Sequence, residues 1–293
     1  MNDKQSGVLA WHWVGSDLKM RDGTPIEMGH RYSIPPGQSP RLYRQGYHAS
    51  VRALDALLAQ PGTVVCAVRL SGEMKACETT LCAAQGQVLW FVDACQALQA
   101  FALACADQAV RAFAPVAVDH AARMLAAVDG RPDIRASAAI FNAYAETLRA
   151  FPAITDSEIA AQIADALSAL NSEVHTHVRQ LAGYSYQNNA DATLFALGDA
   201  GVALDYAVSA VRSACYAWTD PAALACHAAF AARYANYVAD AAHHQVSYLG
   251  ASDRLNDDLE ARLHVLAPTT GTTQNVQPVT RQPQQVALWE IGA

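Results

Sequence analysis

The pattern of apolar residues changes abruptly near Asp93, and this change constrains the fold more than any other feature of the sequence. Before Asp93, apolar residues occur in short runs between Gly- and Pro-containing turns, which is typical of strands. After it, alanine dominates and larger apolar residues recur every three or four positions, as on one face of a helix. The sequence therefore predicts an α+β protein: a small mixed α/β domain over residues 1–93, then a larger all-α, alanine-rich helical bundle over residues 94–267.

Three apolar runs in the first part have the character of strands, over residues 8–14, 63–70 and 87–92. The run at 63–70 is continuous and rich in β-branched residues, so we expect a strand buried on both faces. A short amphipathic helix is predicted over residues 51–58, and Ser50 is placed to cap its N-terminus.

The second part predicts helices near residues 94–113, 118–129, 133–150, 156–182, 190–218, 221–248 and 253–266. Thr155 and Glu158 have the spacing of a capping box, and Gly183 and Gly250 fall where a left-handed C-terminal cap would lie. Alanine at the contact positions lets helices approach closely, so we expect a compact bundle. Residues 268–293 are rich in Thr, Gln and Pro and predict a flexible tail, whose apolar end either docks on its own domain or binds a partner.

The charge balance argues against a nucleic-acid partner. The 293 residues include 20 Lys and Arg against 27 Asp and Glu, for a formal net charge of −7, whereas phosphate backbones require clustered cations. The basic residues that do cluster lie in the first sixty positions and could hold a local anion or a nucleotide phosphate; they are Lys19, Arg21, Arg31, Arg41, Arg44 and Arg52.

We expect neither a membrane span nor a metal site. No apolar run reaches about 18 residues, and the first residues lack the basic and long apolar segments of a signal peptide. The seven cysteines lie mostly in apolar contexts, as buried thiols do in a reducing cytoplasm. The histidines lack the spacing of zinc ligands; His175 and His177, for example, would point to different faces of a helix.

The five residues Gly-Tyr-His-Ala-Ser at 46–50 combine residue types that packing alone seldom needs. Gly46 indicates a positive φ or a close backbone approach. His48 is either a buried structural residue or part of a site, and Ser50 is either a helix cap or a ligand contact. Tyr47 lies between them and could serve both binding and catalysis.

A second candidate is His12, which is bracketed by Trp11 and Trp13. Strand alternation places His12 on the face opposite the two indoles. It is either a half-buried structural histidine or a donor to a ligand near an aromatic platform. The nearest carboxylates are Glu73 and Glu78. The candidate catalytic residues are therefore His12, Tyr47, His48 and Glu73, and the candidate ligand-binding residues are Trp11, Trp13, Tyr47, Ser50 and Arg44.

These motifs resemble a family of uncharacterised domains that are common in phages and prophages. The signature is G-[YLF]-H-x-[SC], met here at 46–50, together with an aromatic first strand at 10–12, a helix at 53–57 and a strand closing at 68–73. The resemblance covers the first third of the chain. It implies a phage- or prophage-borne accessory protein, often with an alanine-rich helical C-terminal region.

The same residues show a more distant likeness to the ADP-ribosyltransferase fold. That likeness implies an enzyme that uses NAD, in which His12 and Tyr47 position the nicotinamide ribose and Glu73 is the acid. His48 or Ser50 would assist.

Three hypotheses for function follow, and whether the chain is an enzyme stays open among them. The first is an accessory protein in the cytoplasm of a bacterial host, which acts without a cofactor by binding a ligand or a host or phage protein, with self-association through the bundle. The second is the NAD-using transferase. The third is a virion or assembly component.

Overall fold

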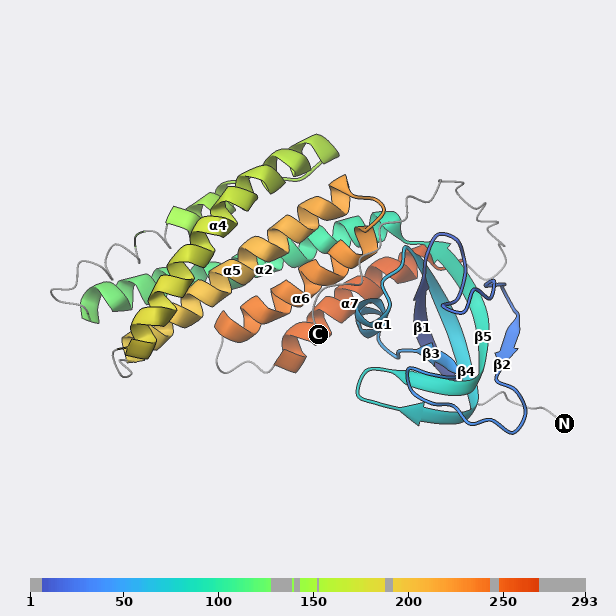
Figure 1. The fold of residues 1–293 in the computed structure, drawn as a ribbon. Helices are drawn as coiled ribbons and strands as arrows, with labels where there is room; N and C mark the ends of the chain where they lie inside the picture. Colours follow the sequence, from blue (N-terminus) through green and yellow to red (C-terminus); the bar gives the residue numbers. More distant parts are fainter. Residues whose placement is uncertain are drawn as a thin grey trace.

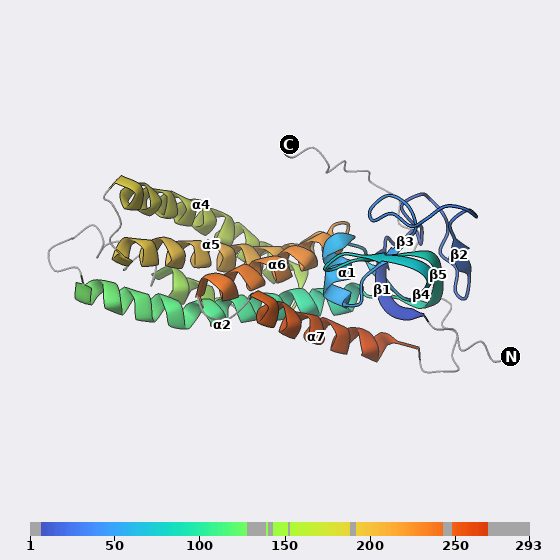
Figure 2. The same cartoon turned by 90° about the horizontal axis from the view of Figure 1, so that it is seen from below.

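The computed structural model describes residues 7–127, 139, 143–151, 153–187, 192–242 and 248–268. It shows an α+β protein, in which an antiparallel sheet in the N-terminal part lies at one end of an elongated array of helices (Figure 1). The view from below shows the same arrangement, with helix α1 at the junction (Figure 2). The predicted fold class is confirmed.

The sheet nearly closes on itself. Its strands are β1 (Val8–Val14), β2 (Arg31–Ser33), β3 (Tyr47–Ala49), β4 (Val64–Ala76) and β5 (Leu81–Asp93). β4 and β5 form a long hairpin, β1 pairs with the free edge of β4, and β2 and β3 pair with the free edge of β5. Beyond β3, Ser50 exchanges two backbone hydrogen bonds with Trp11, at 2.7 and 3.0 Å. The hydrogen-bonded path β1–β4–β5–β3 thus returns to β1, so these four strands form a small barrel, while β2 pairs with β5 alone.

Alternation along β1 separates two hydrophobic cores. Trp11 and Trp13 belong to the core shared with the helices, whereas Ala10 and Val14 face the barrel interior. β4 behaves in the same way, since Val65 joins the helical core and its neighbours fill the barrel. The predicted strand at 63–70 is present, but both of its faces are buried only over residues 64–66; from Ala67 to Leu70, half-buried and buried residues alternate. The strand extends six residues further than predicted, to Ala76, because its end pairs with the start of β5.

The helices described are α1 (Ala53–Ala59), α2 (Cys95–Ala127), α4 (Ser157–Gln187), α5 (Ala192–Thr219), α6 (Leu224–Ala242) and α7 (Tyr248–Leu266). α2, α5 and α6 pack against one another, α4 packs on α5, and α7 lies against α2, α6 and α1. Fully buried alanines at helical spacing, such as Ala203, Ala207 and Ala210 on α5, allow this close approach.

Three predicted helix boundaries are wrong. α2 is one helix that runs through Pro115, where the sequence predicts a break. Gly183 and Gly250 lie inside α4 and α7 rather than at C-terminal caps. A glycine inside a helix costs only about 1 kcal/mol, so favourable neighbours carry the helix through it.

Helix α1 is capped by side chains of helix α7. The predicted cap from Ser50 is wrong, because the backbone of Ser50 is paired with β1 and the cap position falls on Arg52, which makes no side-chain cap. Instead, Glu260 Oε1 and Asn256 Oδ1 of α7 accept hydrogen bonds from the N–H groups of Ala53 and Leu54, both at 3.0 Å. Helices α1 and α7 are thereby joined.

The cap of α4 also differs from the prediction. Asp156, rather than Thr155, accepts the hydrogen bonds of the first turn: its Oδ1 lies 3.0 Å from the N–H of Glu158 and 2.9 Å from that of Ile159. Aspartate is a strong N-cap residue whose charge also favours a helix N-terminus.

One face of the sheet shares a core with the helices. β5 ends at Asp93 and α2 begins at Cys95, at the predicted boundary, but Trp13 of β1 belongs to the same buried cluster as Phe101 of α2 and Leu259 of α7. The predicted tail lies outside the described residues beyond residue 268. In the part of the chain that the structure describes, no helix is long and apolar enough to cross a membrane.

Candidate functional site

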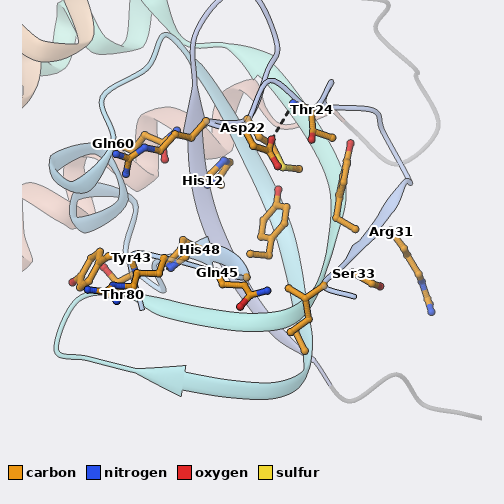
Figure 3. Close-up of a pocket in the computed structure, with 18 of the residues that line it drawn as sticks. His12, Asp22, Thr24, Arg31, Ser33, Tyr43, Gln45, His48, Gln60 and Thr80 are labelled. Atoms are coloured by element: carbon orange, nitrogen blue, oxygen red, sulfur yellow. Dashed lines mark hydrogen bonds between the residues drawn. The ribbon is translucent and has the colours of Figure 1, made fainter. Parts of the chain in front are cut away.

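A cavity of about 910 Å3 lies beside the barrel strands, under the loops that connect β1, β2 and β3. Its wall includes the inward side of β1, both short strands and the end of α1. Figure 3 shows His12 and His48 near one another on the strand side, whereas Arg31 extends away from the centre.

One wall of the cavity is a row of four rings. His12 and Tyr47 have ring centroids 5.3 Å apart, Tyr47 and Tyr32 are 5.9 Å apart, and Tyr32 and His30 are 4.5 Å apart. Gly86 makes room for this row, because a Cβ there would lie 2.3 Å from Cγ of Tyr47. All four residues of the row line the cavity.

Two buried polar atoms of this wall have no hydrogen-bond partner among the described residues: Nε2 of His12 and the hydroxyl of Tyr47. The residues are only 8% and 7% exposed. Burial lowers the pKa of His12 to about 4, against a smaller opposing effect of a backbone hydrogen bond with His48, and burial raises the pKa of Tyr47. Both groups are therefore neutral near pH 7. Each unmet hydrogen bond costs about 1–3 kcal/mol, which a ligand that meets it would recover.

His48 is half-buried and already has a partner. Its Nε2 accepts a hydrogen bond of 2.8 Å from the N–H of Tyr43, and the two rings stack with centroids 6.2 Å apart. Burial lowers the pKa of His48, which keeps Nε2 free to accept. Tyr43 has a φ of +61°, so His48 holds this loop residue in a conformation that L-residues seldom adopt. The geometry favours the structural interpretation of His48, although its ring also lines the cavity.

The charge around the cavity is opposite in sign to that of the whole chain. Three arginines line it, Arg21, Arg31 and Arg44, against one carboxylate, Asp22. Asp22 accepts a hydrogen bond of 3.0 Å from the N–H of Thr24, which lowers its pKa. Within the described segments, none of the three guanidinium groups has an ion-pair or hydrogen-bond partner. Arg21 and Arg44 are therefore free to meet an anion in the cavity, whereas Arg31 extends away from its centre.

The structure brings four of the predicted site residues together and separates the others. His12, Tyr47, His48 and Arg44 all line the cavity. Glu73 does not: it is exposed on the β4–β5 hairpin, where Ser39 donates to Oε2 at 2.9 Å and Lys75 lies 3.3 Å from Oε1.

The tryptophans and Ser50 also lie away from the cavity wall. Trp13 is fully buried and donates from Nε1 to the carbonyl of Ala53 at 3.1 Å. Trp11 packs edge-on against Trp90 and His264. Ser50 is buried and its backbone completes the barrel. These residues hold the strands that carry the site.

Gly46 has both properties expected of it. Its φ is +116°, and a Cβ there would lie 2.6 Å from Sγ of Cys82. Sequence reasoning did not single out Tyr32 or Thr80 as site residues. Both lie outside the 46–50 motif, and their only common signal, an aromatic or hydroxyl residue beside a turn, is frequent in loops.

No metal centre is seen in the described part of the chain, where no three His, Cys, Asp or Glu side chains are placed to hold an ion. Comparison with known proteins adds no relative: no family model, no curated protein and no solved structure matches this chain.

Proposed function

We propose that the barrel binds a small anionic ligand that carries a planar ring, as nucleotides do, and that the protein acts through this binding as an accessory protein of phage or prophage origin in a bacterial cytoplasm. The observation that carries the proposal is the cavity itself. It combines unpartnered buried polar atoms on a wall of rings with unpaired arginines around it.

The ring row supports the planar part of the ligand. His12, Tyr47 and Tyr32 have successive centroids less than 6 Å apart and are tilted rather than coplanar, so a flat ring can contact more than one of them. Stacking of a base on an aromatic side chain contributes about 1–3 kcal/mol. The hydroxyl of Tyr47 and Nε2 of His12 can each make one hydrogen bond to the edge of such a ring.

The arginines support the anionic part. Arg21 and Arg44 are exposed and unpaired, and a guanidinium binds phosphate or carboxylate through two parallel hydrogen bonds. Arg31 is also unpaired, but its side chain extends away from the centre of the cavity. The cavity, at about 910 Å3, is large enough for a nucleotide, since ligand pockets measure about 300–1,000 Å3.

Isothermal titration calorimetry tests the proposal with ATP, AMP and NAD, and with adenosine and inorganic phosphate as the separate halves. We expect a nucleotide to bind more tightly than either half. Tyr47→Phe removes only the unpartnered hydroxyl and should weaken binding about five-fold, the equivalent of about 1 kcal/mol. The matched control, Tyr234→Phe in the bundle, should bind as the wild type does. Absence of binding for every anionic ring compound, or equal effects of the two variants, would refute the proposal.

The NAD-using transferase is a second candidate, because His12, Tyr47 and His48 meet in one cavity. Its expected acid, Glu73, does not line that cavity. Asp22 is the lining carboxylate and is engaged by Thr24. Incubation with labelled NAD and a cell lysate separates the candidates: label transfer with release of nicotinamide supports the enzyme, whereas reversible binding of NAD alone supports the binding protein.

Self-association through the bundle, contact with a host or phage protein, and a role in virion assembly stay hypotheses, because no contact of the described residues bears on them. The mass of the particle in solution tests the first, and a strict monomer would contradict it.

A further inference from the structure

The turn of the β4–β5 hairpin carries an exposed thiol beside the cavity. Cys77 begins the turn and its N–H donates to the carbonyl of Thr80 at 2.9 Å. The sulfur of Cys77 lies 3.2 Å from the hydroxyl of Tyr43, within hydrogen-bond distance. Tyr43 and Thr80 both line the cavity, so the thiol stands at its rim.

The hydroxyl of Thr80 lies at the same contact between Cys77 and Tyr43. Thr80 is only 5% exposed, and its hydroxyl has no hydrogen-bond partner among the described residues. It lies close enough to affect both neighbours: it contributes to a lower pKa of Cys77 and opposes a rise in the pKa of Tyr43. Figure 3 shows Thr80 next to Tyr43 at the edge of the cavity. A sulfur and two hydroxyls therefore form one cluster.

The surroundings of Cys77 favour the thiolate. The hydroxyl of Tyr43 is the largest cause, followed by the backbone of Thr79, and together they lower the pKa of Cys77 to about 7. The charged side chains nearby are Glu73 and Lys75 on β4, which pair with each other at 3.3 Å, and Glu78, which follows Cys77 in the turn. The thiolate is the nucleophilic form of cysteine, so this site is poised to react.

The other described thiols differ from Cys77. Cys66, Cys82, Cys105 and Cys215 are buried, and Cys95 is partly buried. Cys226 is exposed, but burial of its sulfur raises its pKa. Cys226 thus provides a control within the same molecule.

We propose that Cys77 is a modification site that reacts with low-molecular-weight disulfides, such as glutathione disulfide, through the cluster it forms with Tyr43 and Thr80. The sulfur of Cys77 attacks one sulfur of the disulfide. A bond forms between these two sulfurs, the original S–S bond breaks, and the other half leaves as a thiolate that takes a proton from water. Cys77 is oxidised and the released thiol is reduced, so the exchange needs no further reactant.

The mixed disulfide formed on Cys77 would also change the rim of the cavity. Tyr43 stands between Cys77 and His48, with its hydroxyl on the sulfur and its N–H on the imidazole. A substituent on the sulfur displaces the hydroxyl of Tyr43 and occupies the rim. This consequence, a lower ligand affinity, rests on the proposed function; the chemical reactivity of Cys77 does not.

The experiment treats the full chain with glutathione disulfide at several pH values and follows each cysteine by peptide mass spectrometry. A thiol with a pKa of about 7 has about 50 times more thiolate at pH 7 than one with a pKa of 9. Its thiolate is also less nucleophilic, which reduces this rate advantage about eight-fold. We therefore expect Cys77 to react about six-fold faster than an ordinary thiol at pH 7 and faster still than Cys226.

Tyr43→Phe makes the test specific. Tyr43 is 64% exposed, so the loss of its hydroxyl should leave the fold intact. It should move the midpoint of the rate–pH profile of Cys77 upward from about pH 7. Equal rates for Cys77 and Cys226, or an unchanged midpoint in Tyr43→Phe, would overturn the proposal. Modification that proceeds as expected but leaves nucleotide binding unchanged would remove only the effect on the cavity.

Discussion

Protonation of His12 should destabilise the fold, and the size of the effect follows from its burial. The imidazole lies inside the barrel against the ring of Tyr47, with His48 as the neighbouring titratable group. Burial lowers its pKa from 6.5 to about 4. The unfolded chain therefore binds this proton at a higher pH than the folded chain does, and stability must fall as the pH decreases from 6.5 towards 4. Above pH 6.5 the effect is absent.

The magnitude can be worked from the two pKa values of His12. Each pH unit between them costs about 1.4 kcal/mol. Between pH 7 and pH 4.5 the free energy of unfolding should drop by about 2.5 kcal/mol through His12 alone. That is a sizeable share of the 5–15 kcal/mol that typically stabilises a domain.

Urea unfolding at pH 7.0, 5.5 and 4.5 measures this drop in the wild type and in His12→Gln, which keeps a polar side chain but does not titrate. His30→Gln is the control, because the side chain of His30 is 52% exposed. Between pH 7.0 and 4.5, the free energy of unfolding of His12→Gln should fall by about 2.5 kcal/mol less than that of the wild type, whatever the variant's stability at pH 7. The His30→Gln control should show the same fall as the wild type. Parallel pH profiles of the wild type and His12→Gln would show that the burial of His12 is wrong.

Two further substitutions test the architecture around the site. Gly86→Ala places a Cβ 2.3 Å from Cγ of Tyr47, so it should lower the free energy of unfolding by about 1–3 kcal/mol, measured by thermal unfolding, and weaken nucleotide binding. The loss of stability should be smaller in a Tyr47→Leu background. An equal loss in both backgrounds would contradict the contact between Gly86 and Tyr47. Asn256→Ala removes the acceptor for the N–H of Leu54 and should cost about 1–2 kcal/mol. Asn256 Nδ2 donates to Glu260 at 3.0 Å, so the two residues form one cap. Glu260→Gln should therefore lower the free energy of unfolding less in the Asn256→Ala variant than in the wild type. Strictly additive losses would argue against a shared cap.

The sequence predicts the fold class and the apolar parts of the three longest strands, because their signals are local. Period-2 alternation at 8–14 and the unbroken run at 63–70 do not depend on distant residues. The rest of the hairpin was missed: β4 runs on to Ala76, and β5 begins at Leu81 rather than near residue 87. The two three-residue strands were missed because pairing with β5, not their own composition, makes them strands. The cap of α1 was also unpredictable, since Asn256 lies about 200 residues away from it.

The candidate site was predicted in part, for a similar reason. His12, Tyr47 and His48 carry a local signal in their bracketing or motif residues, and all three line the cavity. Glu73 was selected only as the nearest carboxylate in sequence, and nearness in sequence does not decide whether a side chain on the hairpin lines the cavity. The relation of Cys77 to Tyr43 spans 34 residues and depends on how a loop folds over a turn.

The alternation along β1 explains why the cavity wall and its rim should behave differently on binding. Trp11 and Trp13 fasten β1 into the helical core, so His12 between them is held on a strand that cannot shift without disrupting that core. The rim is built mainly from loops instead, and it includes Tyr43 with its positive φ and the unpaired arginines Arg21 and Arg44, whereas Arg31 lies on β2. A ring that reaches the wall therefore meets preorganised partners, and rigid partners lower the entropy cost of binding. The anionic part meets side chains that must still be ordered. Shape and hydrogen bonding at the wall should thus select the ring, while the charges at the rim should accept anions of different lengths.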